Sequence, residues 1–386
     1  MKIALVENFG ADFVGARLRF SIFLKENGVN VTAIVPEDGH RDIIENSGIR
    51  VIEVGGNIRG KGIVNKIDFA KKLKKVLKEE EFDIVHFYRL QPNIIGTFIA
   101  GIYTKSKIVN HITGLGVAFT SNSFKNKCFQ FVIKSLYRFN SLSFKPYTVY
   151  QNEHDKFDLG IKIRTICIAG SAVNEDRFNK EYIINNNDKI NTLKKELDLD
   201  QSVGVKTFIF VSRLLKEKGV MQLIEAFINI NSTQDKKANL LVVGWSDPEN
   251  PSAVKSSDLK KYFKKDKFIK FLGKRSDVND LIALSDVSIL PTYYREGTPR
   301  FLLESMAMSK AIITTDMPGC NHLIPNNENG ILIQPKSIEA IEDAVLTILN
   351  KDLIALGKVS NKLYNDLFSE KIVYSSILNL YKSIKK

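Results

Sequence analysis

The chain has 386 residues, of which 44% are hydrophobic and 26% charged, and it carries a formal net charge of +13. This length exceeds what one hydrophobic core usually serves and predicts two domains, while the composition is that of an ordinary globular protein. The excess of lysine and arginine favours an anionic partner, which means phosphate, nucleic acid or an acidic membrane surface.

The cysteines and the apolar stretches point to a compartment. Cys128, Cys167 and Cys320 lie far apart and form no CxxC pair, so they favour a reducing compartment over a disulfide framework or a metal cage. The apolar run at residues 3–6 is too short for a signal peptide, and the stretch at residues 94–103 is too short to span a bilayer. We therefore expect a cytoplasmic protein.

Short β-branched runs bounded by turn residues recur along the whole chain. We expect strands at residues 2–6, 31–35, 51–54, 83–88, 107–112, 147–151 and 165–169, and again at 206–212, 238–244, 268–273, 287–291, 311–315 and 330–334. Helical patterns separate these runs, and this alternation predicts an α/β fold with two parallel, doubly wound sheets. The predicted organisation is a domain over 1–170, a polar connection over 171–205, a second domain over 206–360, and a C-terminal helix over 361–386 that packs back on the first domain.

One motif follows the expected strand at 287–291. Thr298 suits the N-cap of a helix and Pro299 its first position, so the helix N-terminus lies at the sheet edge and favours anions. Glu296 precedes this helix and suits the hydroxyls of a sugar, whereas Glu304, about one and a half turns into it, suits those of a ribose. On the residues alone, the alternative is equally good: Glu296 would be an ordinary charge in a loop, and Glu304 would lie on a solvated helix face.

A second motif follows the expected strand at 206–212. Arg213 and Lys218 can clamp a diphosphate, the first by its planar fork and the second as a point charge. The alternative is a basic surface loop. In contrast, Asp198 and Asp200 lie in the polar connection, where a solvated turn is the better interpretation than a metal site.

Taken together, these motifs resemble the large retaining glycosyltransferase family 4. The resemblance in the C-terminal half rests on Ser212-Arg213, Lys218-Gly219, the pair Glu296 and Glu304, the strand at 311–315, Gly330, and the loop at 271–275. In the N-terminal half it rests on His111 with the loop at 113–116, on Gln151-Asn152, and on residues 170–173 with Phe178. Residues 131–137 and 244–252 are similar to members that extend bacterial glycans on polyprenyl diphosphate, among them N-acetylgalactosaminyltransferases of bacterial N-glycosylation.

The resemblance implies a fold, a reaction and roles for individual residues. It implies a GT-B fold, in which two Rossmann-like domains bind acceptor and donor, and a retaining transfer from a UDP-sugar to a polyprenyl-diphosphate-linked saccharide. It assigns catalysis to Glu296 and His111, donor binding to Arg213, Lys218, Gly273, Lys274, Arg275, Gly297, Thr298, Pro299, Arg300, Glu304 and Gly10, and acceptor binding to Arg17, Gly114 and Gly116. For His111, a satisfied histidine at a strand end is the alternative. No metal and no cofactor are expected, because fixed cations and a helix N-terminus supply positive charge.

Two basic, amphipathic segments bear on membrane binding. Over 61–78, one helical face carries Ile63, Ile67, Ala70, Leu73 and Leu77, and a helix packed on its sheet is the favoured interpretation. Over 124–145, aromatic residues alternate with bases, which favours an anionic membrane surface. A nucleotide-sugar epimerase and a nucleic-acid-binding protein are the rival functions, although we find no nucleic-acid motif and expect no nucleic acid as partner.

Overall fold

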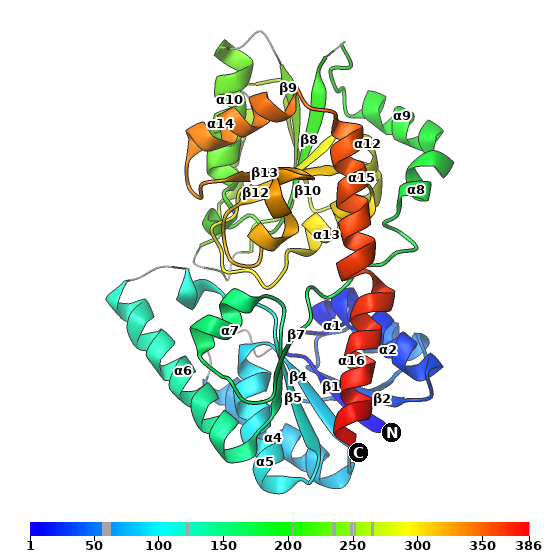
Figure 1. The fold of residues 1–386 in the computed structure, drawn as a ribbon, viewed down its shortest axis with the longest axis vertical. Helices are drawn as coiled ribbons and strands as arrows, with labels where there is room; N and C mark the ends of the chain where they lie inside the picture. The colour runs from blue at the N-terminus through cyan, green and yellow to red at the C-terminus, as the bar shows by residue number, and fades with distance from the viewer. Residues whose placement is uncertain are drawn as a thin grey trace. The chain divides into compact units, whose positions relative to one another are not determined.

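The computed structural model describes residues 1–55, 63–120, 123–202, 204–233, 237–247, 250, 252–263 and 266–385. These form two compact units (Figure 1). The first consists of Met1–Ala172, Glu296–Thr298 and Glu370–Lys386, and the second of Val173–Arg295 and Pro299–Ser369.

The first unit is built on a parallel seven-stranded sheet in the order β3-β2-β1-β4-β5-β6-β7. Its strands are β1 (Lys2–Val6), β2 (Asn30–Val35), β3 (Arg50–Glu53), β4 (Ile84–Tyr88), β5 (Lys107–Ile112), β6 (Tyr147–Tyr150) and β7 (Thr165–Cys167). Alternate residues of β1 enter different cores: Ile3 and Leu5 face one side, and Ala4 and Val6 face the other. Both faces are therefore buried, as is usual for a parallel sheet.

Helices cover both faces of this sheet. The face of Ile3 packs against α1 (Gly10–Ala16), α2 (Leu18–Glu26), α3 (Arg41–Asn46) and α16 (Glu370–Lys385). The opposite face packs against α4 (Ile63–Glu79) and α5 (Thr97–Tyr103). The remaining elements of the unit are a π-turn (Pro92–Gly96), a 3₁₀ turn (Val117–Phe119), α6 (Phe124–Phe144) and α7 (Glu153–Leu159). In Figure 1, α16 lies along the sheet beside α2, although more than 300 residues separate them in the sequence.

The second unit contains a parallel six-stranded sheet in the order β10-β9-β8-β11-β12-β13. Its strands are β8 (Lys206–Val211), β9 (Ala238–Val243), β10 (Ile269–Gly273), β11 (Val287–Leu290), β12 (Ala311–Thr315) and β13 (Gly330–Ile333). Its helices are α8 (Lys180–Asn185), α9 (Asn187–Glu196), α10 (Val220–Thr233), α11 (Ser256–Phe263), α12 (Val278–Leu284), α13 (Arg300–Ala307), α14 (Ile338–Ile348) and α15 (Leu353–Leu363). Short 3₁₀ turns at Lys216–Lys218, Asn321–Leu323 and Pro325–Asn327, and a π-turn at Tyr364–Phe368, complete it.

Each sheet has a point at which the strand order reverses. In the first sheet this point lies between β1 and β4, and in the second between β8 and β11. Ligands of open parallel sheets bind at the carboxyl ends of the strands that flank such a point. The residues that follow these four strands are therefore the first candidates for a functional site.

The predicted fold class is confirmed, and each expected strand is present with its ends shifted by at most two residues. The residues predicted to form the polar connection, 171–205, include two helices, α8 and α9. These helices are held by Asp280, which accepts a hydrogen bond from Tyr182 Oη and pairs with Lys189 Nζ at 2.8 Å.

The expected single helix over 361–386 is wrong. The chain leaves helical geometry at Ser369, where ψ is 155°, and α16 begins at the next residue. Leu367 and Ile372, which lie on either side of this break, are 49% and 41% exposed, whereas Ile377 is buried in the core of the first unit.

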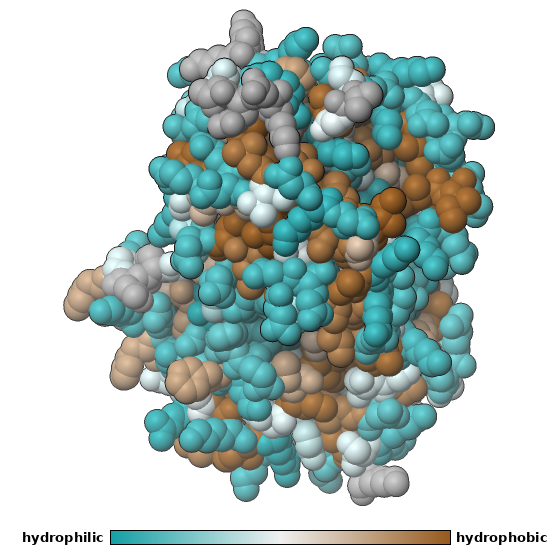
Figure 2. Space-filling view, turned by 45° about the horizontal axis from the view of Figure 1, so that its top comes forward, coloured by the Kyte–Doolittle hydropathy of each residue, from teal (hydrophilic) through white to brown (hydrophobic). Residues whose placement is uncertain are grey.

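The two amphipathic segments differ in what they bury. On α4 the buried residues are Phe69, Leu73 and Leu77, so the segment packs on its sheet, but the expected face is wrong at Ile67, which is 49% exposed. Residues 61–62 and the side chain of Ile63 lie outside the part that the structure describes. On α6, Ile133 and Tyr137 are buried, while large apolar side chains remain exposed at Phe124, Phe129, Phe131, Val132, Leu136, Phe139 and Leu142. Figure 2 shows brown and tan apolar atoms among teal ones on the side where Figure 1 places α6.

Within the described residues, no helix is both long enough and apolar enough to cross a bilayer.

Candidate functional site

The loops that follow β8, β9, β10 and β11 are joined by backbone hydrogen bonds at one edge of the second sheet. Leu214 N–H donates to Trp245 O at 2.9 Å, and Gly244 N–H donates to Gly273 O at 2.8 Å. The loop after β11 is tied in by Tyr293 N–H, which donates to Glu217 O at 2.8 Å. Most of the predicted donor residues therefore lie on one connected edge, at the reversal of the strand order.

Arg213 and Lys218 both lie at the end of β8. Arg213 Nη1 is 3.5 Å from Asp247 Oδ2, and Lys218 Nζ is 5.1 Å from the centre of the Tyr294 ring. The turn that carries Lys218 ends at Gly219, where φ is 75° and a Cβ atom would lie 2.1 Å from Pro291 O. Only glycine allows this close approach to the end of β11, so the local sequence fixes the position of Lys218 beside the reversal point.

The helix after β11 begins one residue later than predicted. Pro299 occupies the N-cap, with ψ at 116°, and its carbonyl accepts hydrogen bonds from Leu302 N–H and Leu303 N–H at 3.1 and 3.3 Å. Arg300 is thus the first helical residue of α13, and Thr298 is not the cap. Because Pro299 has no side-chain oxygen, it cannot cap the backbone N–H groups of the first turn, which keep their preference for an anion.

Glu304 lies on α13 and is largely buried. Its side chain is 13% exposed, and Arg300 Nη2 lies 3.4 Å from Oε1. Burial raises the pKa of Glu304, while the neighbouring guanidinium groups of Arg300 and Arg177 act in the opposite direction. Glu304 is therefore not a solvated helix face.

The short segment Glu296–Thr298 belongs to the first unit by its contacts. Asn152 Nδ2 donates to Gly297 O at 3.0 Å, and a Cβ atom at Gly297 would lie 2.2 Å from Gln151 Oε1. Glycine is required here because a side chain would displace this packing. The residues of the predicted Gln151-Asn152 motif thus meet the loop that carries Glu296.

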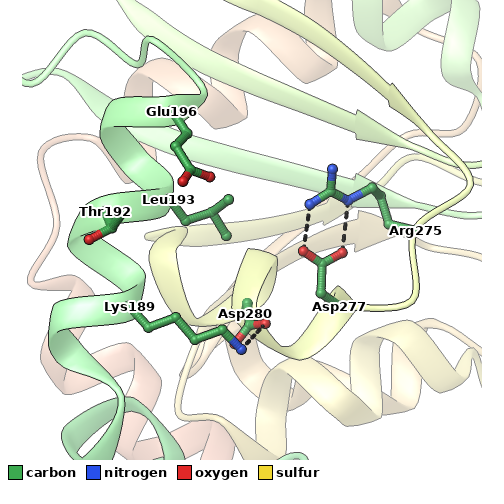
Figure 3. A pocket seen from close by; sticks show the side chains of 7 residues that line it. All are labelled: Lys189, Thr192, Leu193, Glu196, Arg275, Asp277 and Asp280. Carbon is green, nitrogen blue, oxygen red and sulfur yellow. Dashed lines mark hydrogen bonds and ion pairs between the residues drawn. The ribbon is translucent and has the colours of Figure 1, made fainter.

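The loop at 271–275, which carries the predicted donor residues Gly273, Lys274 and Arg275, separates into two environments. Gly273 has φ at 66°, and Lys274 Nζ lies 5.4 Å from the centre of the Trp245 ring. The Arg275 guanidinium instead donates to both carboxylate oxygens of Asp277, at 2.8 and 2.5 Å. Arg275 also lines a cavity of about 330 Å³ beside α9 (Figure 3), whose lining residues are Lys189, Thr192, Leu193, Glu196, Arg275, Asp277 and Asp280.

At the reversal point of the first sheet lies a network of charged residues around a buried carboxylate, which sequence reasoning missed. Glu7 follows β1 and is fully buried, and its Oε1 is 2.9 Å from Nε of Arg89, which follows β4. Arg89 also pairs with Asp12 at 2.8 Å, and its backbone is left-handed, with φ at 72°. Such a conformation is uncommon for a residue with a side chain and is typical of functional sites.

The predicted residues Arg17 and His111 lie beside this network. Arg17 Nε is 3.7 Å from Glu7 Oε2, and its guanidinium carbon is 4.0 Å from the centre of the Tyr88 ring. His111 is 1% exposed, and neither of its ring nitrogens has a hydrogen-bond partner within the described part of the chain. Burial, together with Arg17, holds the pKa of His111 well below its ordinary value, so the imidazole is neutral at pH 7. It is not a satisfied histidine.

The three predicted glycines of the first unit are in different situations. Gly10 N–H donates to Asp38 Oδ2 at 2.7 Å, so this N–H already has a carboxylate partner. Gly114 and Gly116 have left-handed backbones, with φ at 110° and 72°. Gly114 and Arg89 line the same small cavity. Its other lining residues are Leu90, Asn93, Ile112, Thr113, Leu115, Phe119 and Tyr137.

No group of three or more histidine, cysteine, aspartate or glutamate side chains placed to hold a metal occurs among the residues that the structure describes.

Comparison with known families gives two matches, one for each half of the chain. Residues 192–366 match the model of glycosyl transferases group 1, and residues 2–144 match the glycosyl transferase 4-like model.

Comparison with individual proteins gives relatives along the full chain. The chain is 28% identical to an N,N'-diacetylbacillosaminyl-diphospho-undecaprenol alpha-1,3-N-acetylgalactosaminyltransferase of Campylobacter jejuni, with 100% of both chains covered. It is 26% identical to a UDP-Gal:alpha-D-GlcNAc-diphosphoundecaprenol alpha-1,3-galactosyltransferase of Escherichia coli, over 84% of this chain and 83% of the relative. Among solved structures, a glycosyltransferase from Rickettsia africae superposes with a TM-score of 0.79 at 22% identity, covering 100% of this chain and 98% of that one.

Proposed function

Because this chain belongs to the glycosyltransferases and has the GT-B fold, we propose that it moves a sugar from a UDP-sugar to a polyprenyl-diphosphate-linked saccharide with retention of configuration. The family membership favours transfer over the epimerase alternative. The sugar is an N-acetylhexosamine or a hexose, and the product is a glycan of the bacterial surface or of a glycoprotein. The two relatives above act on undecaprenyl-diphosphate-linked sugars by their names, which supports this class of acceptor.

The observation that carries the proposal is the arrangement around the reversal point of the second sheet. Arg213 and Lys218 supply fixed positive charge at the end of β8, and α13 adds a helix N-terminus after β11. A nucleoside diphosphate needs positive charge for its phosphates and an acceptor for its ribose hydroxyls, and Glu304 supplies the acceptor.

In the proposed reaction, these groups stabilise the charge that develops on the leaving diphosphate. The bond between the anomeric carbon and the diphosphate breaks with its electron pair, so negative charge grows on the leaving UDP, where Arg213 and Lys218 stabilise it. The acceptor oxygen forms the new bond to the anomeric carbon, and its proton passes to the leaving phosphate. Glu296 orients the donor sugar, and the neutral His111 accepts a hydrogen bond from it.

A donor screen tests the proposal. Purified protein is incubated with a panel of UDP-sugars and a polyprenyl-diphosphate-linked saccharide, and the products are analysed by mass spectrometry. Nuclear magnetic resonance of the new linkage should show the anomeric configuration of the donor. An inverted linkage, or release of free sugar without transfer, contradicts the proposal.

We expect the transfer to survive EDTA. Fixed cations at the end of β8 take the role of a metal, so chelation should change the initial rate by less than about twofold. The same assay without EDTA and with added Mg²⁺ or Mn²⁺ serves as the control. Loss of activity that either ion restores is the outcome against this expectation.

The proposed acceptor also implies a role for a membrane. Its diphosphate lies at the level of lipid headgroups, and α6 offers exposed aromatic residues together with Lys125, Lys127 and Lys134. Aromatic side chains suit the interfacial region, and each basic residue near an anionic surface contributes about 1 kcal/mol. We propose that α6 docks on anionic lipid at the inner face of the cytoplasmic membrane.

Flotation with liposomes that contain anionic lipid measures this docking. The wild type should float at low salt, and a variant with Lys125→Glu, Lys127→Glu and Lys134→Glu should remain largely unbound. A matched control reverses three lysines of α4, with Lys71→Glu, Lys75→Glu and Lys78→Glu, and should float like the wild type. Salt should weaken the attachment only in part, because the aromatic contribution is not screened. Equal flotation of the two triple variants contradicts α6 as the docking surface.

A further inference from the structure

A group of polar side chains lies inside the first unit, where α16 covers the sheet. His86 and Tyr88 belong to β4 and His111 to β5, and none of the three is more than 1% exposed. Tyr381 of α16 is fully buried beside them. Its Oη lies 2.5 Å from Nδ1 of His86, and Tyr88 Oη lies 3.2 Å from the same nitrogen. A hydrogen bond therefore ties α16 to a central strand of the sheet.

The rings of His86, Tyr88 and His111 form a stack. The centres of the His86 and Tyr88 rings are 4.2 Å apart, with 23° between the ring planes. His111 is nearly parallel to His86, at 11° and 5.4 Å, and its ring centre is 5.2 Å from that of Tyr88. Burial, followed by the effects of His111 and Arg17, holds the pKa of His86 well below its ordinary value. Both imidazoles are therefore neutral and stack without charge repulsion.

The orientation of His111 depends on this stack. A functional histidine is often oriented by a hydrogen bond at one of its ring nitrogens. Neither ring nitrogen of His111 has such a partner in the part of the chain that the structure describes, so the rings packed against it set its direction. One of these rings, His86, is in turn held by Tyr381.

We propose that Tyr381 is a positioning residue for the transfer: its hydroxyl fixes the ring of His86, which together with Tyr88 fixes the ring of His111. A functional side chain keeps its productive geometry only when the side chains that support it are fixed themselves. This inference rests on the proposed function, because that function gives His111 its contact with the donor sugar. Since Tyr381 acts on orientation, its loss should appear in kcat.

Tyr381→Phe removes the hydroxyl and keeps the ring. The variant should lower kcat of the sugar transfer about tenfold, because a small misplacement of a reacting group is costly, and should change the KM for the UDP-sugar by less than about twofold. Steady-state kinetics measure both constants, and thermal unfolding reports the stability of each variant. Unchanged kcat in Tyr381→Phe overturns the proposal.

Tyr374→Phe is the matched control. Tyr374 lies on the same helix, is 5% exposed, and packs against Phe20 as Tyr381 does. Its Oη lies 3.3 Å from Glu370 Oε1 instead of in the stack. Loss of this hydroxyl should lower the melting temperature to a similar extent and leave kcat unchanged. An equal fall of kcat in both variants would mean that the helix acts only through stability, which contradicts the proposal.

A double-mutant cycle tests whether Tyr381 acts through His111. His111→Ala alone should lower kcat, and adding Tyr381→Phe to it should cause no further loss. Two residues that act independently would instead give losses that multiply. Multiplied losses would overturn the proposal even if each single variant behaves as expected.

The histidine rings are also observable without the reaction. The chain contains five histidines, so magnetic resonance spectra of protein labelled at histidine are simple, and His111→Ala assigns the signals of His111. Tyr381→Phe should shift the ring signals of His86 and His111, whereas Tyr374→Phe should leave both in place. Unshifted His111 signals in Tyr381→Phe overturn the positioning role while the proposed function stands. If the wild type transfers no sugar from any UDP-sugar, the proposed function is overturned, and the spectra still decide whether Tyr381 fixes His111.

Discussion

Replacing Glu296 by glutamine should lower kcat on the order of 100-fold with little change in the KM for the donor. Its segment is fixed by the hydrogen bond from Asn152 to Gly297 O and by the absence of room for a side chain at Gly297. A preorganised group that acts on the reacting sugar contributes more in the transition state than in the ground state, and its loss therefore appears in kcat. Steady-state kinetics against the UDP-sugar measure both constants.

Glu304→Gln provides the comparison on the same motif. A ribose contact is made equally in the ground state and the transition state, so its loss should raise the donor KM about tenfold and leave kcat nearly unchanged. Burial raises the pKa of Glu304, so this carboxylate should become protonated at a higher pH than that of an ordinary glutamate. The difference in donor KM between the wild type and Glu304→Gln should therefore shrink as the pH falls. Wild-type kinetics in both variants, or the opposite division between kcat and KM, contradict the two roles.

The fold could be predicted because its signals are local. A strand that is buried on both faces, such as β4 or β9, is a mostly apolar run between turn residues, and each such run that we expected to be a strand is one. The positions of Arg213 and Lys218 could be predicted in the same way, because both follow the same strand by a few residues and Gly219 fixes the turn.

The remaining features depend on residues that are distant in the sequence. The pairing of Arg89 with Glu7 requires the knowledge that β1 and β4 are neighbours, and no local pattern carries that information. Gly10, predicted to bind the donor, donates its N–H to Asp38, a carboxylate 28 residues away. The only local signal for Arg89 was a charge directly after a buried strand, the same signal that identified Arg213.

A competing local interaction also went unrecognised. Asp277 lies two residues after Arg275 and holds its guanidinium through two hydrogen bonds, so Arg275 and Lys274 do not share one environment. Pro299 was predicted at the first helical position. Its backbone is extended, with ψ at 116°, so it lies at the N-cap and Arg300 begins the helix.

Arg213→Ala and Lys218→Ala should each lower kcat/KM for the donor by a factor of about 100 or more, because fixed positive charge at the leaving diphosphate is needed most when its bond breaks. Arg213→Lys should recover only part of the loss, since lysine keeps the charge and lacks the planar fork. The control is Lys216→Ala, an exposed lysine two positions before Lys218 in the same 3₁₀ turn, and it should behave like the wild type. Equal losses in all three alanine variants would mean that only the net charge of the surface matters. Wild-type activity in Arg213→Ala and Lys218→Ala, together with inactivation by EDTA, would assign the stabilisation of the leaving group to a metal ion instead.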